Sequence, residues 1–194
     1  MPTIHSVAVF CGSRLGRNPA YAESAAALGR ALGQAGIRLV YGGGRVGLMG
    51  TLADAVLKAG GQVTGVIPEF LTRWEVAHPG VQDMHITDSM HSRKRLMFEL
   101  ADAFVSFPGG VGTLDETIEI ISWRQLRLHD KPVMLCDIAG SASALVAAVE
   151  AAITEGFALP SARELFQVVD GVDALMEQLL SMTAAPQAVP AERL

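Results

Sequence analysis

Short apolar segments alternate with longer amphipathic segments along most of the chain. Five of the short segments predict strands buried on both faces, and they span residues 5–10, 37–41, 62–67, 102–107 and 131–136. Further strands are expected at residues 81–87 and 165–170. The amphipathic segments predict helices over residues 19–36, 47–60, 90–101, 113–128, 142–157 and 171–182. This alternation predicts a doubly wound, Rossmann-like α/β fold, with a mostly parallel sheet and helices on both faces.

The alternation runs without an internal repeat or a linker-like break, so residues 1–182 are expected to form one domain. Pro19 and Gly36 suit the start and the end of the first helix. The last twelve residues, 183–194, have no apolar periodicity and are expected to form a flexible tail.

Composition narrows the classes of function. The chain has 194 residues, of which half are apolar, and a net charge of −5, which argues against a nucleic-acid-binding surface. Its two cysteines, Cys11 and Cys136, each end an apolar segment, as expected of reduced, buried thiols. Neither a signal peptide nor an apolar run of roughly 20 residues is found, so we expect a cytoplasmic protein without membrane contact.

Glycine-containing loops follow three of the predicted strands, at residues 11–16, 42–50 and 108–113. Ligands bind at the carboxyl ends of the strands in such sheets, and backbone amides at helix N-termini bind anions. The sequence therefore predicts an anion-binding site. One alternative is NAD, because "GGGRVG" at 42–47 matches the dinucleotide fingerprint and Glu69 lies at a suitable distance for a ribose hydroxyl.

Arg93 falls on the apolar face of its predicted helix, together with Met90, Met97 and Leu100. An unpaired charge in that place is very costly, so Arg93 needs an anionic partner. An internal salt bridge and a ligand both satisfy this requirement, and we favour the ligand.

Glu116 ends the segment "TLDE", which fits a capping box with Thr113 as the N-cap. In that position the helix dipole favours the ionised carboxylate. A carboxylate beside an anion-binding loop and opposite an arginine is suited to cleavage of a ribosyl–base bond, which passes through an oxocarbenium-like state.

These residues also form known motifs. "PGGVGTLDE" (108–116) fits the P-G-G-x-G-T-x-x-E signature of the Lonely Guy family, and "MHSRK" (90–94) fits its M-H-x-R-K element. The chain resembles this family over most of its length up to about residue 136. Members are cytokinin riboside 5′-monophosphate phosphoribohydrolases, which release the free base and ribose 5-phosphate from an N6-modified adenosine 5′-monophosphate.

The resemblance implies a metal-independent hydrolase without a cofactor, acting on a small nucleotide. It implies that Arg93 and Glu116 are catalytic. It implies that substrate is bound by Glu75, Lys94, Gly109, Gly110, Val111, Gly112, Thr113, Leu114, Asp115 and Ser122. Gly43, Gly44 and Met90 are further candidates for contacts with the phosphate or the base. Whether the substrate is an isopentenylated adenylate or AMP stays open.

Two other functions are alternatives to hydrolysis. A carrier of a nucleotide or of the molybdenum cofactor would bind phosphate on the same fold without turnover. Relatives are often named lysine decarboxylases, whose pyridoxal phosphate forms a Schiff base with a lysine. The chain has only three lysines, Lys58, Lys94 and Lys131, and we interpret that name as wrong.

The helix predicted at residues 113–128, after the glycine-containing loop at 108–113, is apolar on two sides. Its Leu114, Ile118, Ile121 and Leu128 are expected to pack on the sheet. Ile120 and Trp123 then remain for a partner, and we predict a homodimer with the active site near the subunit interface.

Overall fold

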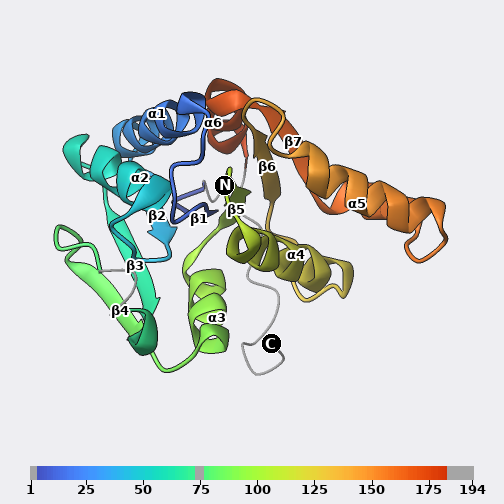
Figure 1. Cartoon of the computed structure of the whole chain (residues 1–194), viewed down its shortest axis with the longest axis horizontal. Coiled ribbons are helices and arrows are strands. Elements are labelled where there is room, and N and C mark those ends of the chain that lie inside the picture. Colours follow the sequence, from blue (N-terminus) through green and yellow to red (C-terminus); the bar gives the residue numbers. More distant parts are fainter. Residues whose placement is uncertain (1–3, 73–76, 183–194) are drawn as a thin grey trace.

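The computed structural model describes residues 4–72 and 77–182. Helices and strands alternate as the sequence predicts (Figure 1). The strands are β1 Ser6–Phe10, β2 Arg38–Tyr41, β3 Val63–Pro68, β4 Asp83–Thr87, β5 Ala103–Ser106, β6 Val133–Asp137 and β7 Gln167–Asp170. The helices are α1 Pro19–Ala35, α2 Gly47–Lys58, α3 Met90–Leu100, α4 Val111–Gln125, α5 Ser143–Thr154 and α6 Gly171–Ser181, with short 3₁₀ turns at Glu69–Leu71 and Pro160–Leu165.

Within the described residues the strands form one seven-stranded sheet in the order β4-β3-β2-β1-β5-β6-β7. Every neighbouring pair is parallel. The doubly wound α/β fold is thereby confirmed, including both edge strands. The predicted tail at 183–194 lies outside the described residues.

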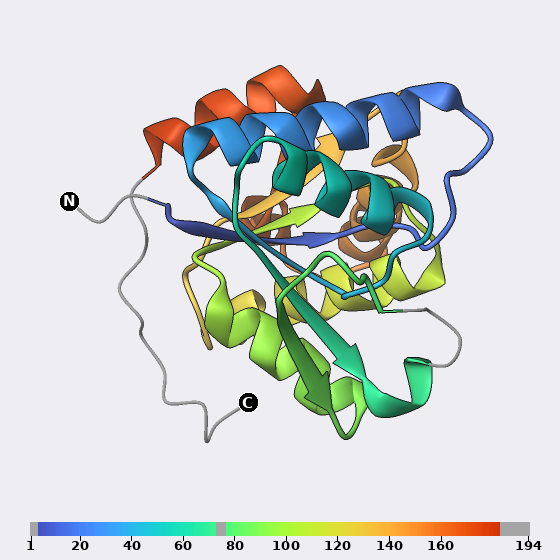
Figure 2. The same ribbon diagram turned by 90° about the vertical axis from the view of Figure 1, so that its left-hand side faces the viewer.

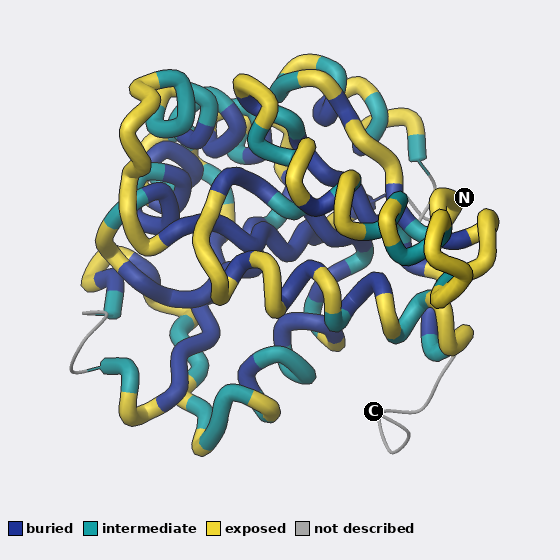
Figure 3. The backbone as a smooth tube through the Cα atoms, turned by 45° about the vertical axis from the view of Figure 1, so that its right-hand side comes forward, coloured by how far each residue is buried: buried dark blue, intermediate teal, exposed yellow. Residues whose placement is uncertain are grey.

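Helices cover both faces of the sheet (Figure 2). Leu28, Leu52 and Leu175 represent the core under α1, α2 and α6, and all three are fully buried. The opposite core lies under α3, α4 and α5, and includes Phe98, Phe104 and Ile120. Buried strands run through the middle of the molecule, with exposed segments around them (Figure 3).

The ends of α1 follow from its sequence. The Asn18 side chain accepts a hydrogen bond from the Ala20 amide, and Pro19 is the first helical residue. Gly36 ends the helix with a φ of 69°, a left-handed conformation that favours glycine.

The buried face of α4 differs from the prediction. Thr113, Glu116, Thr117, Ile120 and Ile121 are buried, whereas Leu114 and Ile118 are 45% and 42% exposed. Trp123 packs against the core, with its ring edge-on to Phe98. Ile120 is therefore not available to a partner subunit. The cause is that polar residues of this helix face inward, where Arg93 of α3 pairs with Glu116 and Ser106 of β5 accepts a hydrogen bond from Thr117.

The order of the strands creates a crevice beside β1. From β1 the chain moves outward through β2, β3 and β4, then returns to place β5 on the other side of β1. The loops that follow β1 and β5 lead to helices on opposite faces of the sheet, α1 and α4 (Figure 1). Such a switch point is where ligands bind in open α/β sheets.

Candidate active site

The three glycine-containing loops meet at this switch point. The Gly12 amide donates a hydrogen bond of 3.0 Å to the Pro108 carbonyl. The Gly12 carbonyl accepts hydrogen bonds from the amides of Leu48 and Met49, at 3.0 and 3.3 Å. The loop after β1 is thus joined both to the start of α2 and to the loop after β5.

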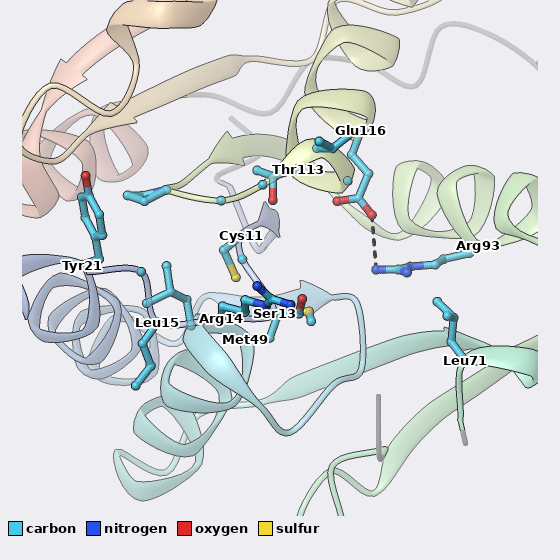
Figure 4. A pocket seen from close by; sticks show the side chains of 18 of the residues that line it. Cys11, Ser13, Arg14, Leu15, Tyr21, Met49, Leu71, Arg93, Thr113 and Glu116 are labelled. Atoms are coloured by element: carbon cyan, nitrogen blue, oxygen red, sulfur yellow. Dashed lines mark ion pairs between the residues drawn. The ribbon is translucent and has the colours of Figure 1, made fainter. Parts of the chain in front are cut away.

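Between these loops lies a cavity of about 530 Å³ (Figure 4), a size typical of small-molecule sites, which span roughly 300–1,000 Å³. Its polar and charged lining comes from Ser13, Arg14, Arg93, Thr113 and Glu116. The remaining lining residues are Cys11, Gly12, Leu15, Gly16, Tyr21, Leu48, Met49, Leu71, Met90, Pro108, Gly109, Gly110, Val111 and Gly112.

Arg93 and Glu116 form an ion pair in the cavity wall. The Arg93 Nη2 atom lies 3.2 Å from Glu116 Oε1, and their side chains are 7% and 9% exposed. Of the two partners that the sequence allowed for Arg93, the structure shows the internal salt bridge, and this pair itself lines the cavity. Among the described residues the Arg93 Nε atom finds no hydrogen-bond partner. A buried donor of this kind is satisfied by a ligand or by water.

Gly42 makes room for this arginine. A Cβ atom at position 42 would lie 2.2 Å from Arg93 Nη2 and 3.1 Å from the Met49 Sδ atom. Gly47, with a φ of 65°, approaches the Ser13 backbone equally closely, at 2.2 Å from its carbonyl carbon to a built Cβ. Packing therefore explains these two glycines of the NAD fingerprint without a dinucleotide.

The capping box predicted at Thr113 is wrong. Helix α4 begins at Val111 after an extended Gly110, so Thr113 is the third helical residue and Glu116 the sixth. Among the described residues, no side-chain hydrogen bond caps the N-terminus of this helix. The cause is that Gly110 permits an earlier start, which leaves the amides of Val111, Gly112 and Thr113 at the cavity. Uncapped amides at a helix N-terminus bind anions.

The buried Cys11 lines the same cavity. Burial raises the pKa of its thiol, and the negative charge of Glu116 raises it further. The thiol therefore stays protonated at neutral pH and is not a nucleophile.

Several residues that the resemblance implied lie outside the cavity lining. Lys94 forms ion pairs of 3.1 Å with Asp115 and with Glu119. Leu114 is half-exposed, and the Ser122 hydroxyl donates a hydrogen bond to the Ile118 carbonyl.

The loop after β2 contributes little to the lining. The Gly43 carbonyl accepts a hydrogen bond from the His78 amide, and Gly44 pairs with Ala77. Neither glycine lines the cavity, whereas Met90 does. Glu75 lies outside the described residues.

Sequence reasoning marked the loop at 11–16 but assigned none of its side chains to the site. Arg14 and Ser13 are the polar side chains it missed. Tyr21 of α1 and Leu71 also line the cavity, and no motif in the sequence signals them.

In residues 4–72 and 77–182, no cluster of three or more His, Cys, Asp or Glu residues is arranged to hold a metal ion. The helices of the same residues include none whose length and apolar character would allow it to cross a membrane.

Known proteins resemble this chain in sequence and in fold. The family described as "Possible lysine decarboxylase" matches residues 49–179. A cytokinin riboside 5′-monophosphate phosphoribohydrolase from Rhodococcoides fascians is 45% identical over 181 residues, covering 93% of this chain and 91% of that protein. A protein of the same name from Arabidopsis thaliana is 42% identical, covering 89% and 80%.

Solved structures share the fold at lower identity. The molybdenum cofactor binding protein from Rippkaea orientalis superposes with a TM-score of 0.68 at 20% identity, covering 92% of this chain and 96% of that one. DNA processing protein A from Helicobacter pylori gives 0.60 at 14% identity, covering 92% and 81%. These likenesses show the fold alone. By sequence, however, the chain belongs to the family of the cytokinin riboside 5′-monophosphate phosphoribohydrolases, the Lonely Guy family that its motifs resemble.

Proposed function

We propose that this protein hydrolyses the N-glycosidic bond of an N6-modified adenosine 5′-monophosphate, releasing the free base and ribose 5-phosphate. The observation that carries the proposal is the buried Arg93–Glu116 pair in the wall of a cavity bordered by the uncapped start of α4. The relatives named phosphoribohydrolases are 40% to 45% identical, which supports the same activity here.

The phosphate would lie against the amides of Val111, Gly112 and Thr113. A helix N-terminus carries about half a positive charge, which favours an anion there. A side chain built on Gly110 or Gly112 would meet no other atom within 4 Å, so the cavity stays open in front of these amides.

The reaction breaks the bond between ribose C1′ and the base nitrogen, whose electron pair leaves with the base. The Glu116 carboxylate would stabilise the positive charge that develops on the ribosyl group and orient the attacking water. The water oxygen bonds to C1′, and one of its protons ends on the departing base. Arg93 would hold Glu116 in place and direct its unpartnered Nε–H toward the nucleotide.

The name lysine decarboxylase does not suit this cavity. All three lysines lie in the described residues, and none of them lines it. A Schiff base with pyridoxal phosphate would have no lysine to form on there. The relation to molybdenum cofactor proteins rests on about 20% identity and extends to the fold alone.

A chromatographic assay tests the activity. Without added metal or cofactor, the purified protein should release isopentenyladenine from isopentenyladenosine 5′-monophosphate. It should act far more slowly on the nucleoside, which lacks the phosphate. AMP, assayed in parallel, shows whether the N6 group is required. Equal rates on nucleotide and nucleoside would contradict the phosphate site, and binding without any release would favour a carrier.

We also propose that the protein is a cytoplasmic homodimer. Both cysteines are unpaired and buried, as is common in reducing compartments. Helix α4 exposes Val111, Leu114 and Ile118 beside the cavity, at 84%, 45% and 42%. A second copy that covered these side chains would lie next to the active site.

A further inference from the structure

The cavity contains one cation that neither the motifs nor the ion pairs explain. Of the described residues that line it, two are positively charged, Arg14 and Arg93, and one is negatively charged, Glu116. The charge of Arg93 is balanced by Glu116. The Arg14 side chain makes no hydrogen bond or ion pair with any described residue. The lining thus has one uncompensated positive charge in a chain of net charge −5.

The backbone that carries Arg14 is held firmly. Gly47 packs against it so closely that a Cβ at position 47 would lie 2.4 Å from the Arg14 nitrogen. On its other side, Gly12 is hydrogen-bonded to Pro108. A Cβ on Gly16 would lie 2.7 Å from the Tyr21 ring, so the loop backbone packs closely against α1 at this end. The backbone of Arg14 is therefore held in place by these contacts, while its long side chain has no partner among the described residues.

The Arg14 side chain lies between Tyr21 and the Arg93–Glu116 pair in the view of the cavity (Figure 4). The loop of Arg14 adjoins the loop that leads into α4, because Gly12 contacts both Pro108 and Gly109. The loop that carries Arg14 thus lies at the same end of the cavity as the start of α4.

We infer that Arg14 binds the 5′-phosphate of the substrate and makes the enzyme select nucleotides over nucleosides. This inference rests on the proposed function and adds a residue to it. A phosphate monoester carries a charge of about −1.5 to −2 at neutral pH, more than the half charge of a helix N-terminus can balance. A guanidinium supplies a full charge and paired donors that fit phosphate oxygens.

Calorimetry with ribose 5-phosphate tests the inference without requiring turnover. The Arg14→Gln variant should bind ribose 5-phosphate about tenfold or more weakly than the wild type, as expected for the loss of a charged hydrogen bond. Arg14→Lys should restore part of the affinity, because it keeps the charge and loses the fork. Arg17→Gln is the matched control, since Arg17 is an exposed arginine of the same segment that does not line the cavity.

Kinetics give a second readout. In Arg14→Gln, kcat/KM for the nucleotide should fall about tenfold or more, and the ratio of kcat/KM for the nucleotide to that for the nucleoside should fall with it. Added salt should weaken nucleotide binding more in the wild type than in the variant.

Wild-type affinity for ribose 5-phosphate in Arg14→Gln would overturn the inference, even if hydrolysis is confirmed. Equal losses of affinity in Arg14→Gln and Arg17→Gln would also overturn it, because they would indicate long-range electrostatic attraction instead of a direct contact between Arg14 and the phosphate. If the wild type does not bind ribose 5-phosphate, the proposed phosphate site itself is contradicted. Release of base by the wild type tests the proposed hydrolysis separately.

Discussion

The Arg93 guanidinium and the Glu116 carboxylate are 7% and 9% exposed, and each is the other's partner in the cavity wall. Removing the charge of Glu116 leaves the buried Arg93 guanidinium without its charged partner, which is more destabilising than breaking an exposed ion pair. Glu116 therefore holds Arg93 in place, and the role in the reaction that we propose for Glu116 depends on the same contact.

Glu116→Gln should lower kcat by about a hundredfold or more, because the variant lacks the charge that we propose stabilises the ribosyl cation. It should also lower the free energy of unfolding by about 1–3 kcal/mol, since Arg93 loses its charged partner. A capping box would have predicted no such loss. Chromatographic assays and urea denaturation measure the two effects.

Glu119→Gln is the control. Glu119 lies on the same helix and pairs with Lys94 of α3 at 3.1 Å, outside the cavity lining. Its activity should stay near that of the wild type. If Glu116→Gln is also as active as the wild type, Glu116 has a structural role only.

At the level of elements, the loop after β2 and helix α3 meet in a very tight contact. Arg93 reaches the cavity only because Gly42 has no side chain in its way. Gly42, the first glycine of the sequence that suggested a dinucleotide, thus makes room for an arginine 51 positions later in the sequence. In a contact this close, adding a single methyl group forces the neighbouring side chain to move.

Gly42→Ala should therefore displace the Arg93 side chain and lower kcat/KM by about tenfold or more, as expected when a contact to a charged group is lost. The φ of Gly42 is not positive, so alanine is not strained by the backbone itself.

Gly36→Ala is the control, because its backbone is strained by a φ of 69° but a Cβ there would meet no atom within 4 Å. That variant should lose about 1 kcal/mol of stability and keep the activity of the folded protein. Full activity in Gly42→Ala would show that Arg93 can be accommodated elsewhere.

For the whole molecule, the question is which surface a second copy would cover. The buried face of α4 already contains Glu116, Ile120 and the inner edge of Trp123. Its outer face carries Leu114 and Ile118, and Leu126 follows the helix with an exposure of 69%. The predicted interface therefore moves from Ile120 and Trp123 to this outer face.

Light scattering should give a mass of about twice the 20.5 kDa of one chain. Ile118→Glu should halve that mass, because a charge in an apolar interface is costly to bury. Leu180→Glu is the control, since Leu180 is a 57% exposed residue of α6 on the other face of the sheet. A wild-type protein that remains a monomer at high concentration would contradict the homodimer.

The sequence alone determined the sheet, the helices around it and the residues of the two motifs. Strands buried on both faces are continuous apolar runs, and helices show their period, so both are visible locally. Arg93 was recognised because a charge on an apolar helix face always requires a partner. Only the tertiary structure identified that partner as Glu116, 23 residues later, because a pairing between two helices leaves no trace in the periodicity of either.

The start and the buried face of α4 were also decided by the tertiary structure. Hydrophobic periodicity assigns polar residues to the outside, yet Thr117 is buried because its hydroxyl reaches the Ser106 hydroxyl at the end of β5. Arg14 and Tyr21 became part of the site for a related reason: β1 lies beside β5 in the sheet, which brings the loop after β1 to the start of α4. Strand order depends on how all the elements pack together, and no single segment encodes it.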